Sequence, residues 1–145
     1  MSLKWTSVLA FALMVAGLAW LLARGEVIAR SIPAIAVQIA AVALMIAARI
    51  TFGRRSFHAA ANPTAGGLVT NGPYAWLRHP IYAAVLYFVW STALDHHTWQ
   101  ALTAAALVTV GGIIRMLAEE TLLVQRYPVY AAYRSRTARV IPFLL

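Results

Sequence analysis

The sequence predicts an all-α protein: an integral membrane helical bundle of about four transmembrane helices, followed by an amphipathic C-terminal helix. Of its 145 residues, 62% are hydrophobic and only 11% are charged, and the mean hydropathy is +0.74. This composition lies outside the range of soluble domains. The length allows a single membrane domain, 1–145, which divides into an N-terminal helical hairpin, 1–50, and a part that carries the candidate site, 51–145.

The first predicted helix is Trp5–Ala23, a run without a charged residue. At about 1.5 Å per residue, it covers most of a hydrocarbon core about 30 Å thick. A cleaved signal peptide is the alternative, because Lys4 precedes the apolar run. The run is longer than the apolar region of a typical signal peptide, and no convincing small-residue cleavage site precedes Arg24. We therefore expect a retained transmembrane helix.

A second helix is predicted to follow the short polar turn 24–30 and to extend to Ala48. It begins with Ser31 and Pro33, which are residue types that start helices. Because the turn is short, we expect the first two helices to form a tight hairpin. Gln38 is a single neutral polar residue inside the second helix, and such an amide more often makes an interhelical hydrogen bond than binds a ligand.

The segment 72–82 is a dense group of polar, aromatic and turn-forming residues. Pro80 is well placed as the first residue of the next helix, where its missing N–H costs nothing, and His79 is then the N-cap. Nearby lie one cation and two phenols, namely Arg78, Tyr74 and Tyr82. Together with a positive helix end, these groups favour the binding of an anion. Interfacial anchoring at a membrane surface is the alternative.

Two apolar runs after this segment are short for transmembrane helices. They are Ile81–Leu94 and Trp99–Ile114, with 14 and 16 residues, and 14 helical residues cover only about 21 Å. We therefore expect the polar residues at their ends to line a cavity slightly below the membrane surface. From Arg115 onward the chain becomes amphipathic, and its last part should lie along the headgroups or fold back over the site. The long polar loop 51–71 leads into the site, which favours a function for it.

Positive charge is distributed unevenly along the predicted topology. Four spans put ten of the twelve Lys and Arg residues on one face and leave only Arg24 and Arg30 on the other. The face with ten should be cytoplasmic. The formal net charge of +8 is spread over membrane-flanking segments, so we expect contact with lipid headgroups and no nucleic acid. The chain has no cysteine, and His96-His97 lacks ligand spacing, so we expect no metal.

Arg115 and Glu119 are four residues apart on a predicted helix, so their side chains share one face. An ordinary ion pair at a membrane edge is the alternative interpretation. However, the chain has only four acidic residues, and two of them, Glu119 and Glu120, are adjacent in an arginine-rich region. We infer that one of these carboxylates faces inward.

Three motifs in order carry a resemblance to a known family. The first is Gly-Pro-Tyr-x-x-x-Arg-His-Pro-x-Tyr from Gly72, and the second is Arg115-x-x-x-Glu119-Glu120. The third combines Tyr130-x-x-Tyr133 with Arg139-x-x-Pro142. Together they resemble the isoprenylcysteine carboxyl methyltransferase and phospholipid methyltransferase family of integral membrane enzymes. The resemblance covers about half of the chain, from Gly66 onward.

This resemblance implies S-adenosyl-L-methionine as the cofactor and a role for each matched residue. Arg115 falls at the proposed catalytic position that binds the substrate carboxylate. Arg139 matches the basic residue before the closing Ile-Pro, which is implied to bind the substrate as well. The residues implied to bind the cofactor are Gly66, Gly67, Leu68, Val69, Tyr74, His79, Pro80, Ile81, Tyr82 and Glu119. The chain departs from the family in two ways. It has Tyr127-Pro128 where Phe-Gly is usual before the Tyr-x-x-Tyr pair, and this stretch is one residue shorter than in the family. It also has fewer helices before the motif than the eukaryotic enzymes.

The function that we expect is methyl transfer from S-adenosylmethionine to a lipophilic, membrane-embedded acceptor or a lipidated substrate. A carboxylate acceptor is preferred, because an amine beside Arg115 would meet a like charge. The alternatives are a phospholipid N-methyltransferase, a non-catalytic protein that binds lipids or a partner, and a membrane reductase. The chain has no G-x-G-x-x-G after a strand and no room for a soluble-type cofactor domain. We expect a multi-pass protein of a bacterial inner membrane, with its site on the cytoplasmic side.

Overall fold

The computed structural model describes residues 3–53 and 67–142, and these residues form a helical protein without strands. The elements are α1 (Leu3–Arg24), α2 (Ile32–Phe52), the 3-10 helix η2 (Gly72–Ala75), α3 (Pro80–His96), α4 (Trp99–Arg126) and α5 (Tyr130–Arg136). The prediction of an all-α membrane bundle with a C-terminal helix is therefore confirmed. Gly66 and most of the predicted loop 51–71 lie outside the described residues.

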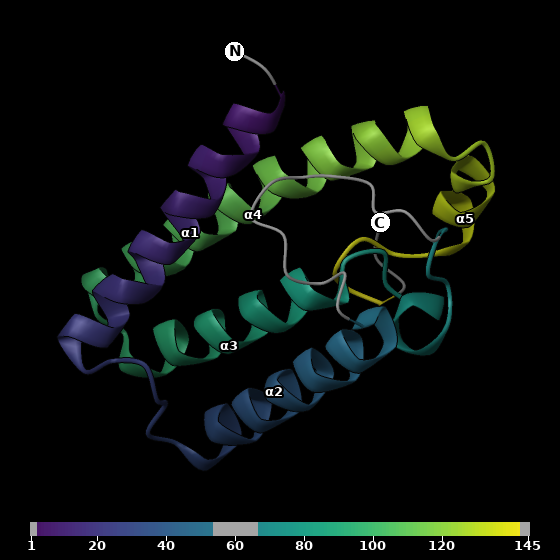
Figure 1. The fold of residues 1–145 in the computed structure, drawn as a ribbon. Helices are drawn as coiled ribbons and strands as arrows, with labels where there is room; N and C mark the ends of the chain where they lie inside the picture. The colour runs from purple at the N-terminus through teal and green to yellow at the C-terminus, as the bar shows by residue number, and fades with distance from the viewer. Residues whose placement is uncertain (1–2, 54–66, 143–145) are drawn as a thin grey trace.

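The four long helices pack as two pairs, α1 with α4 and α2 with α3, and α3 joins the pairs by packing on α4 (Figure 1). The predicted tight hairpin of α1 and α2 is wrong as a packing unit, because within the described residues these two helices make at most marginal contact. The turn between them is short, but each helix finds its apolar partner in the C-terminal half of the chain. The sequence distance between helices therefore did not decide which of them pack together.

Two glycines bring α1 and α4 close together. A Cβ atom at Gly17 would lie 2.8 Å from Val108 Cγ2, and one at Gly111 would lie 2.6 Å from the backbone oxygen of Ala10. Small residues at a helix–helix interface allow backbones to approach in this way in membrane proteins. The close approach places the middle of α1, from Ala10 to Gly17, against the part of α4 that precedes Arg115.

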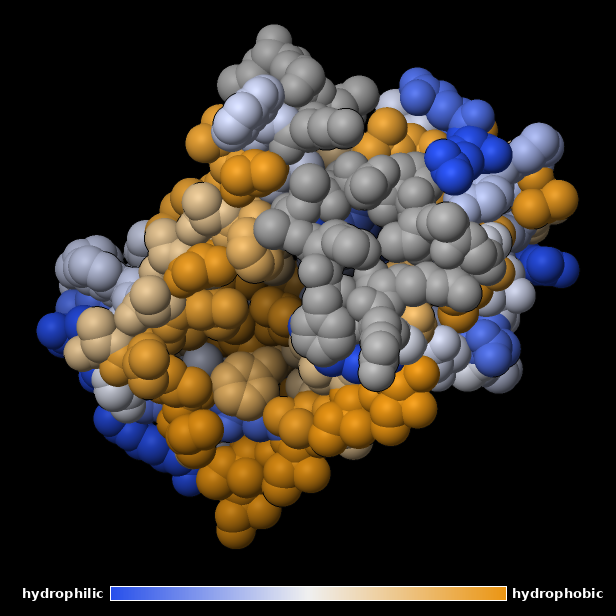
Figure 2. Space-filling view, viewed as in Figure 1, coloured by the Kyte–Doolittle hydropathy of each residue, from blue (hydrophilic) through white to orange (hydrophobic). Residues whose placement is uncertain are grey.

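Three helices are long and apolar enough to cross a membrane, namely 5–24, 32–52 and 99–126. The fourth predicted span corresponds to α3, whose 17 residues cover about 26 Å, and it stays a prediction. Only 28% of the span in α1 and 17% of that in α2 are buried inside the protein. Figure 2 shows the resulting apolar surface over α1 and α2, with a hollow between them. Apolar side chains on these faces are suited to contact with lipid.

Several helix ends follow the sequence signals, and two helices extend beyond them. Pro80 is the first residue of α3, and His79 is its N-cap, although the imidazole makes no capping bond. The second helix does not end at Ala48 but continues to Phe52, where Gly53 ends it with a φ of 68°. Past the predicted apolar run, α4 continues to Arg126 because the charged side chains after Ile114 find partners inside the protein.

The turn between α1 and α2 is bonded to the turn between α3 and α4, at the left of Figure 1. Asp95 accepts hydrogen bonds from the backbone N–H groups of Arg30 and Ser31. The hydroxyls of Thr92 and Thr98 donate to the backbone oxygen and the carboxylate of Glu26, at 2.8 and 3.0 Å. We call this group of contacts the far end, since the cavity described below lies at the opposite end of the bundle.

Gln38 and His96 also belong to the far end. The Gln38 amide accepts from the N–H of Ala29 at 3.0 Å and donates to the backbone oxygen of Val27 at 2.9 Å. The prediction of an interhelical hydrogen bond for Gln38 is therefore wrong, because the amide bonds to the backbone of the turn between α1 and α2. His96 lies 2.9 Å from the backbone oxygen of Ile28. These polar side chains provide hydrogen-bond partners for backbone groups of the turn between α1 and α2.

Candidate functional site

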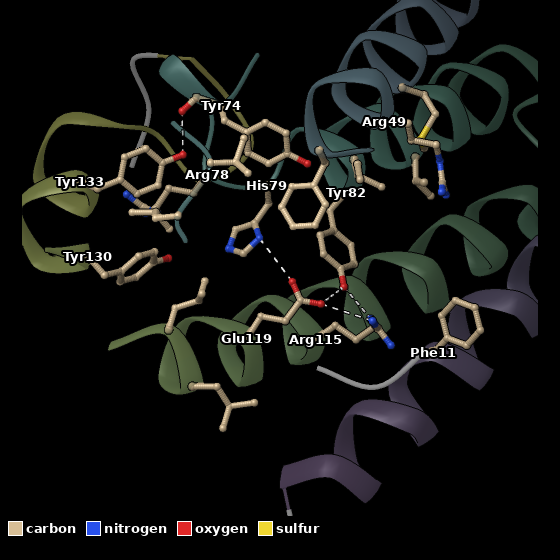
Figure 3. A pocket seen from close by; sticks show the side chains of 18 of the residues that line it. Phe11, Arg49, Tyr74, Arg78, His79, Tyr82, Arg115, Glu119, Tyr130 and Tyr133 are labelled. Carbon is tan, nitrogen blue, oxygen red and sulfur yellow. Dashed lines mark hydrogen bonds and ion pairs between the residues drawn. The ribbon is translucent and has the colours of Figure 1, made fainter. Parts of the chain in front are cut away.

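A cavity of about 400 Å³ lies at the end of the bundle opposite to the far end (Figure 3). Side chains from α1, α2, α3 and α4 line it, together with residues 67–69 and the C-terminal segment. Of the residues singled out in the sequence, those that line the cavity are Gly67, Leu68, Val69, Tyr74, Arg78, His79, Ile81, Tyr82, Arg115, Glu119, Tyr130 and Tyr133. Segments far apart in the sequence thus meet at one cavity.

Three residues of the predicted site stand apart from this lining. Gly66 lies outside the described residues. Pro80 is fully buried as the first residue of α3 and does not line the cavity, so its side chain serves the helix start. Arg139 lies behind the cavity wall, where its guanidinium makes two bonds to Glu120 at 3.0 and 3.1 Å. A role for Arg139 in substrate binding stays a prediction.

Arg115, Glu119 and Tyr82 form a hydrogen-bonded cluster on the cavity wall. Arg115 and Glu119 stack one turn apart on α4, with Nη2 3.3 Å from Oε1. Arg115 Nε donates to the Tyr82 hydroxyl at 2.6 Å, and that hydroxyl donates to Glu119. The guanidinium also lies 5.1 Å from the ring centre of Phe11 on α1. The predicted shared face of Arg115 and Glu119 is therefore confirmed.

Glu120 forms a second and more buried cluster. Its side chain is 6% exposed, against 25% for Glu119. Its Oε1 accepts from Arg78 Nε at 3.1 Å and lies 3.2 Å from His79 Nε2, and both of its oxygens bind Arg139. The inference that one carboxylate faces inward is incomplete, because both do: Glu119 lies at the cavity and Glu120 lies behind it.

The His79 imidazole lies between the two carboxylates. Its Nε2 contacts Glu120, and its Nδ1 lies 3.8 Å from Glu119 Oε2. Its ring also meets the Tyr82 ring edge-on, with centres 5.7 Å apart. As the N-cap of α3, His79 lies beside the turn of α4 that carries both glutamates. His79 therefore joins the open and the buried carboxylate.

The C-terminal segment folds back beside the start of α3. The N–H groups of Arg78 and His79 donate to the backbone oxygens of Ala138 and Arg139, at 2.7 and 3.1 Å, and Leu77 and Ala138 form an isolated parallel bridge. Arg78 also donates from Nη1 to the backbone oxygens of Arg134 and Thr137. Of the two arrangements that the sequence left open for this segment, folding back over the site is the one observed.

A wall of tyrosines closes the cavity on the side of the C-terminal segment. It consists of Tyr74, Tyr127, Tyr130 and Tyr133. The Tyr133 hydroxyl donates to the backbone oxygen of Tyr74 at 2.7 Å, and the Tyr74 ring lies 5.4 Å from that of Phe52. Burial raises the pKa of Tyr133 to about 12 and that of Tyr74 further still. These two phenols are therefore neutral at physiological pH and act as hydrogen-bonding groups on an aromatic surface.

Sequence reasoning missed the contribution of α1 and α2 to the cavity. These helices supply an apolar wall together with one cation, namely Phe11, Met14, Val15, Leu18, Met45, Phe52 and Arg49. In the sequence, these residues look like ordinary members of transmembrane helices, so no local signal marks the wall. Arg49 is an exception, since an arginine at the end of an apolar run is a candidate for a site.

The chemistry of the cavity is that of a site for a ligand with a charged and an apolar part. The described part of its lining combines one carboxylate, one imidazole and several guanidinium groups with mostly aliphatic or aromatic side chains. Among the described residues, no three His, Cys, Asp or Glu side chains are placed to hold a metal ion. Organic ligands with an amino-acid-like end fit this donor set.

Comparison with known proteins agrees with the motifs. Residues 29–129 match the phospholipid methyltransferase family. The match begins before α2 and ends just before α5, so it includes the His79, Arg115 and Glu119 positions. No curated protein and no solved structure matches the chain.

Proposed function

The chain belongs to the phospholipid methyltransferase family, and on this basis we propose that it transfers a methyl group from S-adenosylmethionine to a lipophilic acceptor. The transfer takes place in the cavity, and the acceptor enters from the bilayer. Three helices long enough to cross a membrane and the apolar surface of α1 and α2 support a protein that works in lipid.

The observation that carries the proposal is the convergence of three separate segments at one cavity. Residues 67–69, the start of α3 and the Arg115–Glu119 turn of α4 all contribute to its lining. S-adenosylmethionine presents an ammonium, a carboxylate and an adenosine, and each of these needs a different kind of partner. The three segments supply one kind of partner each.

Glu119 is the acidic residue that lines the cavity, and its partly exposed carboxylate suits the ammonium of the cofactor. His79 and Tyr82 are close to Glu119, and their N–H and O–H groups would donate to the cofactor carboxylate once the cofactor ammonium replaces them at Glu119. Leu68 and Val69 lie on the apolar and aromatic part of the lining, which suits the adenosine. The donor set therefore fits the cofactor that the family implies.

The protein has little acid–base chemistry to perform in this reaction. When bound, S-adenosylmethionine supplies a methyl group on a positively charged sulfur, which keeps the bonding electron pair as the acceptor atom takes the methyl. The residues of the cavity have to align the two reactants and keep water away from the acceptor. The apolar wall from α1 and α2 provides that exclusion, and a carboxylate acceptor needs no catalytic base.

Arg115 supports a carboxylate as the acceptor. Its guanidinium lies where the polar cluster meets the apolar wall, between the Tyr82 and Phe11 rings. Because it already pairs with Glu119, an acceptor carboxylate would share Arg115 with that residue. Arg49 and Arg78 add further positive charge to the lining. This excess of arginine favours an anionic acceptor over a cationic one.

A phospholipid amine is the second candidate acceptor, because the matched family is described by phospholipid methylation. The two candidates separate in an assay with radiolabelled S-adenosylmethionine and either a prenylcysteine or phosphatidylethanolamine vesicles. A carboxylate acceptor yields a methyl ester, which dilute base releases as methanol. Methylation of an amine yields a label that resists base.

The cavity end is proposed to face the cytoplasm. Arg49, Arg78, Arg115 and Arg139 all lie at this end of the bundle, whereas Arg24 and Arg30 lie at the far end. An excess of positive residues is typical of the cytoplasmic side. A soluble cofactor made in the cytosol would then reach the cavity directly.

Calorimetric titration of the detergent-purified protein with S-adenosylhomocysteine tests the proposal. We expect a dissociation constant in the micromolar range, about −8 kcal/mol. Binding should be lost in Glu119→Gln and His79→Ala, whereas Arg115→Ala should impair turnover more than affinity. Glu26→Gln is the matched control, because Glu26 is a buried carboxylate at the far end, and its replacement should leave binding unchanged.

The competing hypotheses predict different outcomes of this titration. A non-catalytic lipid-binding protein and a nicotinamide-dependent reductase should both show no heat and no thermal stabilisation with S-adenosylhomocysteine. Equal loss of folding in the Glu119, His79 and Arg115 variants would instead mark the cluster as a structural network. If the wild-type protein does not bind S-adenosylhomocysteine, the methyltransferase proposal is refuted.

A further inference from the structure

Tyr130 is a buried residue of the cavity wall whose polar atom is not used by the fold. It begins α5, lines the cavity and is 1% exposed. Its hydroxyl has no hydrogen-bond partner among the described residues. In Figure 3 this hydroxyl points from the wall toward the interior of the cavity, on the side of His79.

Two other tyrosines of the cavity show how unusual this is. The hydroxyls of Tyr82 and Tyr133 each bond to the protein, the first to Glu119 and the second to the backbone oxygen of Tyr74. A buried hydroxyl without a partner is unfavourable, and phenylalanine would fill the same volume without that penalty. An unsatisfied buried group therefore calls for an explanation, and a ligand that completes its bonding is one.

The position of Tyr130 indicates which part of a ligand it meets. Its ring lies 5.9 Å from that of Tyr133, which is bonded to Tyr74, so Tyr130 belongs to the aromatic wall. Glu119 and Arg115 occupy a different part of the lining, on α4. In the proposed function Glu119 takes the amino-acid end of the cofactor, which leaves the nucleoside for the aromatic wall.

We propose that the Tyr130 hydroxyl forms a hydrogen bond with the nucleoside part of the bound cofactor and so positions it on the tyrosine wall. The ribose hydroxyls and the purine nitrogens are groups that a neutral phenol can bond. This inference rests on the proposed function, since it assigns a residue to the same cofactor. Tyr130 would act as a binding and positioning residue, without taking part in the transfer itself.

The test compares Tyr130→Phe with Tyr133→Phe, two variants that each remove one hydroxyl from the same wall. In Tyr130→Phe we expect an unchanged or raised melting temperature without ligand, and an affinity for S-adenosylhomocysteine that falls about three- to tenfold. In Tyr133→Phe we expect a lower melting temperature, because a bond within the protein is lost. A melting temperature that falls only in Tyr133→Phe, together with weaker ligand binding in Tyr130→Phe, would support the assignment.

A shortened ligand identifies the part of the cofactor that Tyr130 contacts. 5′-Methylthioadenosine keeps the nucleoside and lacks the amino-acid end. Tyr130→Phe should weaken binding of this probe by the same factor as binding of S-adenosylhomocysteine. Glu119→Gln should weaken only S-adenosylhomocysteine. Loss of affinity for S-adenosylhomocysteine alone in Tyr130→Phe would overturn the assignment to the nucleoside.

The failure of this inference is distinguishable from the failure of the proposed function. If the wild-type protein binds both probes and Tyr130→Phe binds them equally well, the role of Tyr130 is refuted and the proposed function stands. A Tyr130→Phe protein that loses stability as Tyr133→Phe does would likewise refute it. If the wild-type protein binds neither probe, the proposed function fails, and the role of Tyr130 fails with it.

Discussion

The two ends of the bundle use their carboxylates in opposite ways. At the far end, Asp95 accepts hydrogen bonds from backbone N–H groups, and Glu26 accepts one from the Thr98 hydroxyl. At the cavity end, Glu119 and Glu120 are held by arginine and histidine side chains. The chain thus divides its four acidic residues equally between the two ends.

This difference separates residues that hold the fold from residues available to a ligand. At the far end, the carboxylates accept hydrogen bonds from neutral donors, and these bonds join two turns of the chain. At the cavity end, Glu120 is enclosed and holds Arg78 and Arg139, while Glu119 keeps a quarter of its side chain exposed. Of the four carboxylates, Glu119 is the one that lines the cavity. The burial and the hydrogen bonds of the four acidic residues therefore distinguish Glu119 from the others, which their positions in the sequence alone do not.

The largest expected effect comes from breaking the buried cluster at the cavity end. Glu120→Gln leaves Arg78 and Arg139 without their carboxylate, and loss of one partner of a buried ion pair costs about 3–5 kcal/mol. Thermal unfolding in detergent should show this loss, and limited proteolysis should show easier cleavage of the C-terminal segment. Glu26→Gln at the far end should cost only about 1 kcal/mol. Equal losses in the two variants would contradict the difference between the ends.

Gly111→Ala is expected to disturb the packing that brings α1 to the cavity. Its Cβ would lie 2.6 Å from the backbone oxygen of Ala10, and such overpacking costs about 1–3 kcal/mol. Gly112→Ala is the matched control, because the nearest atom to its Cβ is Tyr82 Cδ1 at 4.0 Å. Denaturant titrations of both variants should show a loss of stability only for Gly111→Ala. A loss of equal size in Gly112→Ala would point to the helix itself rather than to its packing.

Thr92→Val tests whether the far end serves stability alone. The change keeps the shape of the side chain and removes the hydrogen bond from the buried Thr92 hydroxyl to the backbone oxygen of Glu26. The expected loss is about 1 kcal/mol in the free energy of unfolding. Affinity for S-adenosylhomocysteine should stay the same, measured by the titration described above. A change in affinity would show that the two ends are coupled.

The last expected effect, which is absent at physiological pH and therefore smallest there, is a dependence of stability on alkaline pH. Burial raises the pKa of Tyr133 to about 12, whereas an unfolded tyrosine ionises near pH 10. The resulting contribution to stability is therefore complete below about pH 10 and is lost as the pH rises to about 12. Melting temperatures across this interval should fall more steeply for the wild-type protein than for Tyr133→Phe. If the melting temperatures of the two proteins fall equally with pH, ionisation of Tyr133 is not the cause of the loss of stability.

Much of the fold could be predicted because apolar runs and helix-start residues are local signals. Pro80 as the first residue of α3 and the shared face of Arg115 and Glu119 follow from spacing alone, and the structure has both. The pairing of helices was not predictable in this way. The turn between α1 and α2 indicated a hairpin, but close approach at Gly17 and Gly111 pairs α1 with α4 instead.

The candidate site was predictable where a motif marks it and not where tertiary packing creates it. The motif residues His79 and Tyr82 line the cavity as expected, but Phe11 on α1 had no sequence signal. Tyr130 belonged to a motif without an assigned role, and only its burial and its unpaired hydroxyl set it apart. The adjacency of two glutamates left open which of them would be enclosed. Contacts with Arg78 and Arg139, distant in the sequence, decided that question.

The bonds at the far end also constrain how the bundle can deform. Glu26 and Asp95 tie the two turns together, so the helix pairs α1–α4 and α2–α3 cannot separate there without breaking several hydrogen bonds. A motion that widens the space between the pairs is then a rotation about this fixed end. The displacement of a helix residue in such a rotation increases with its distance from the far end. The cavity end, farthest from the pivot, is where a bulky ligand gains the most room for the smallest change in angle.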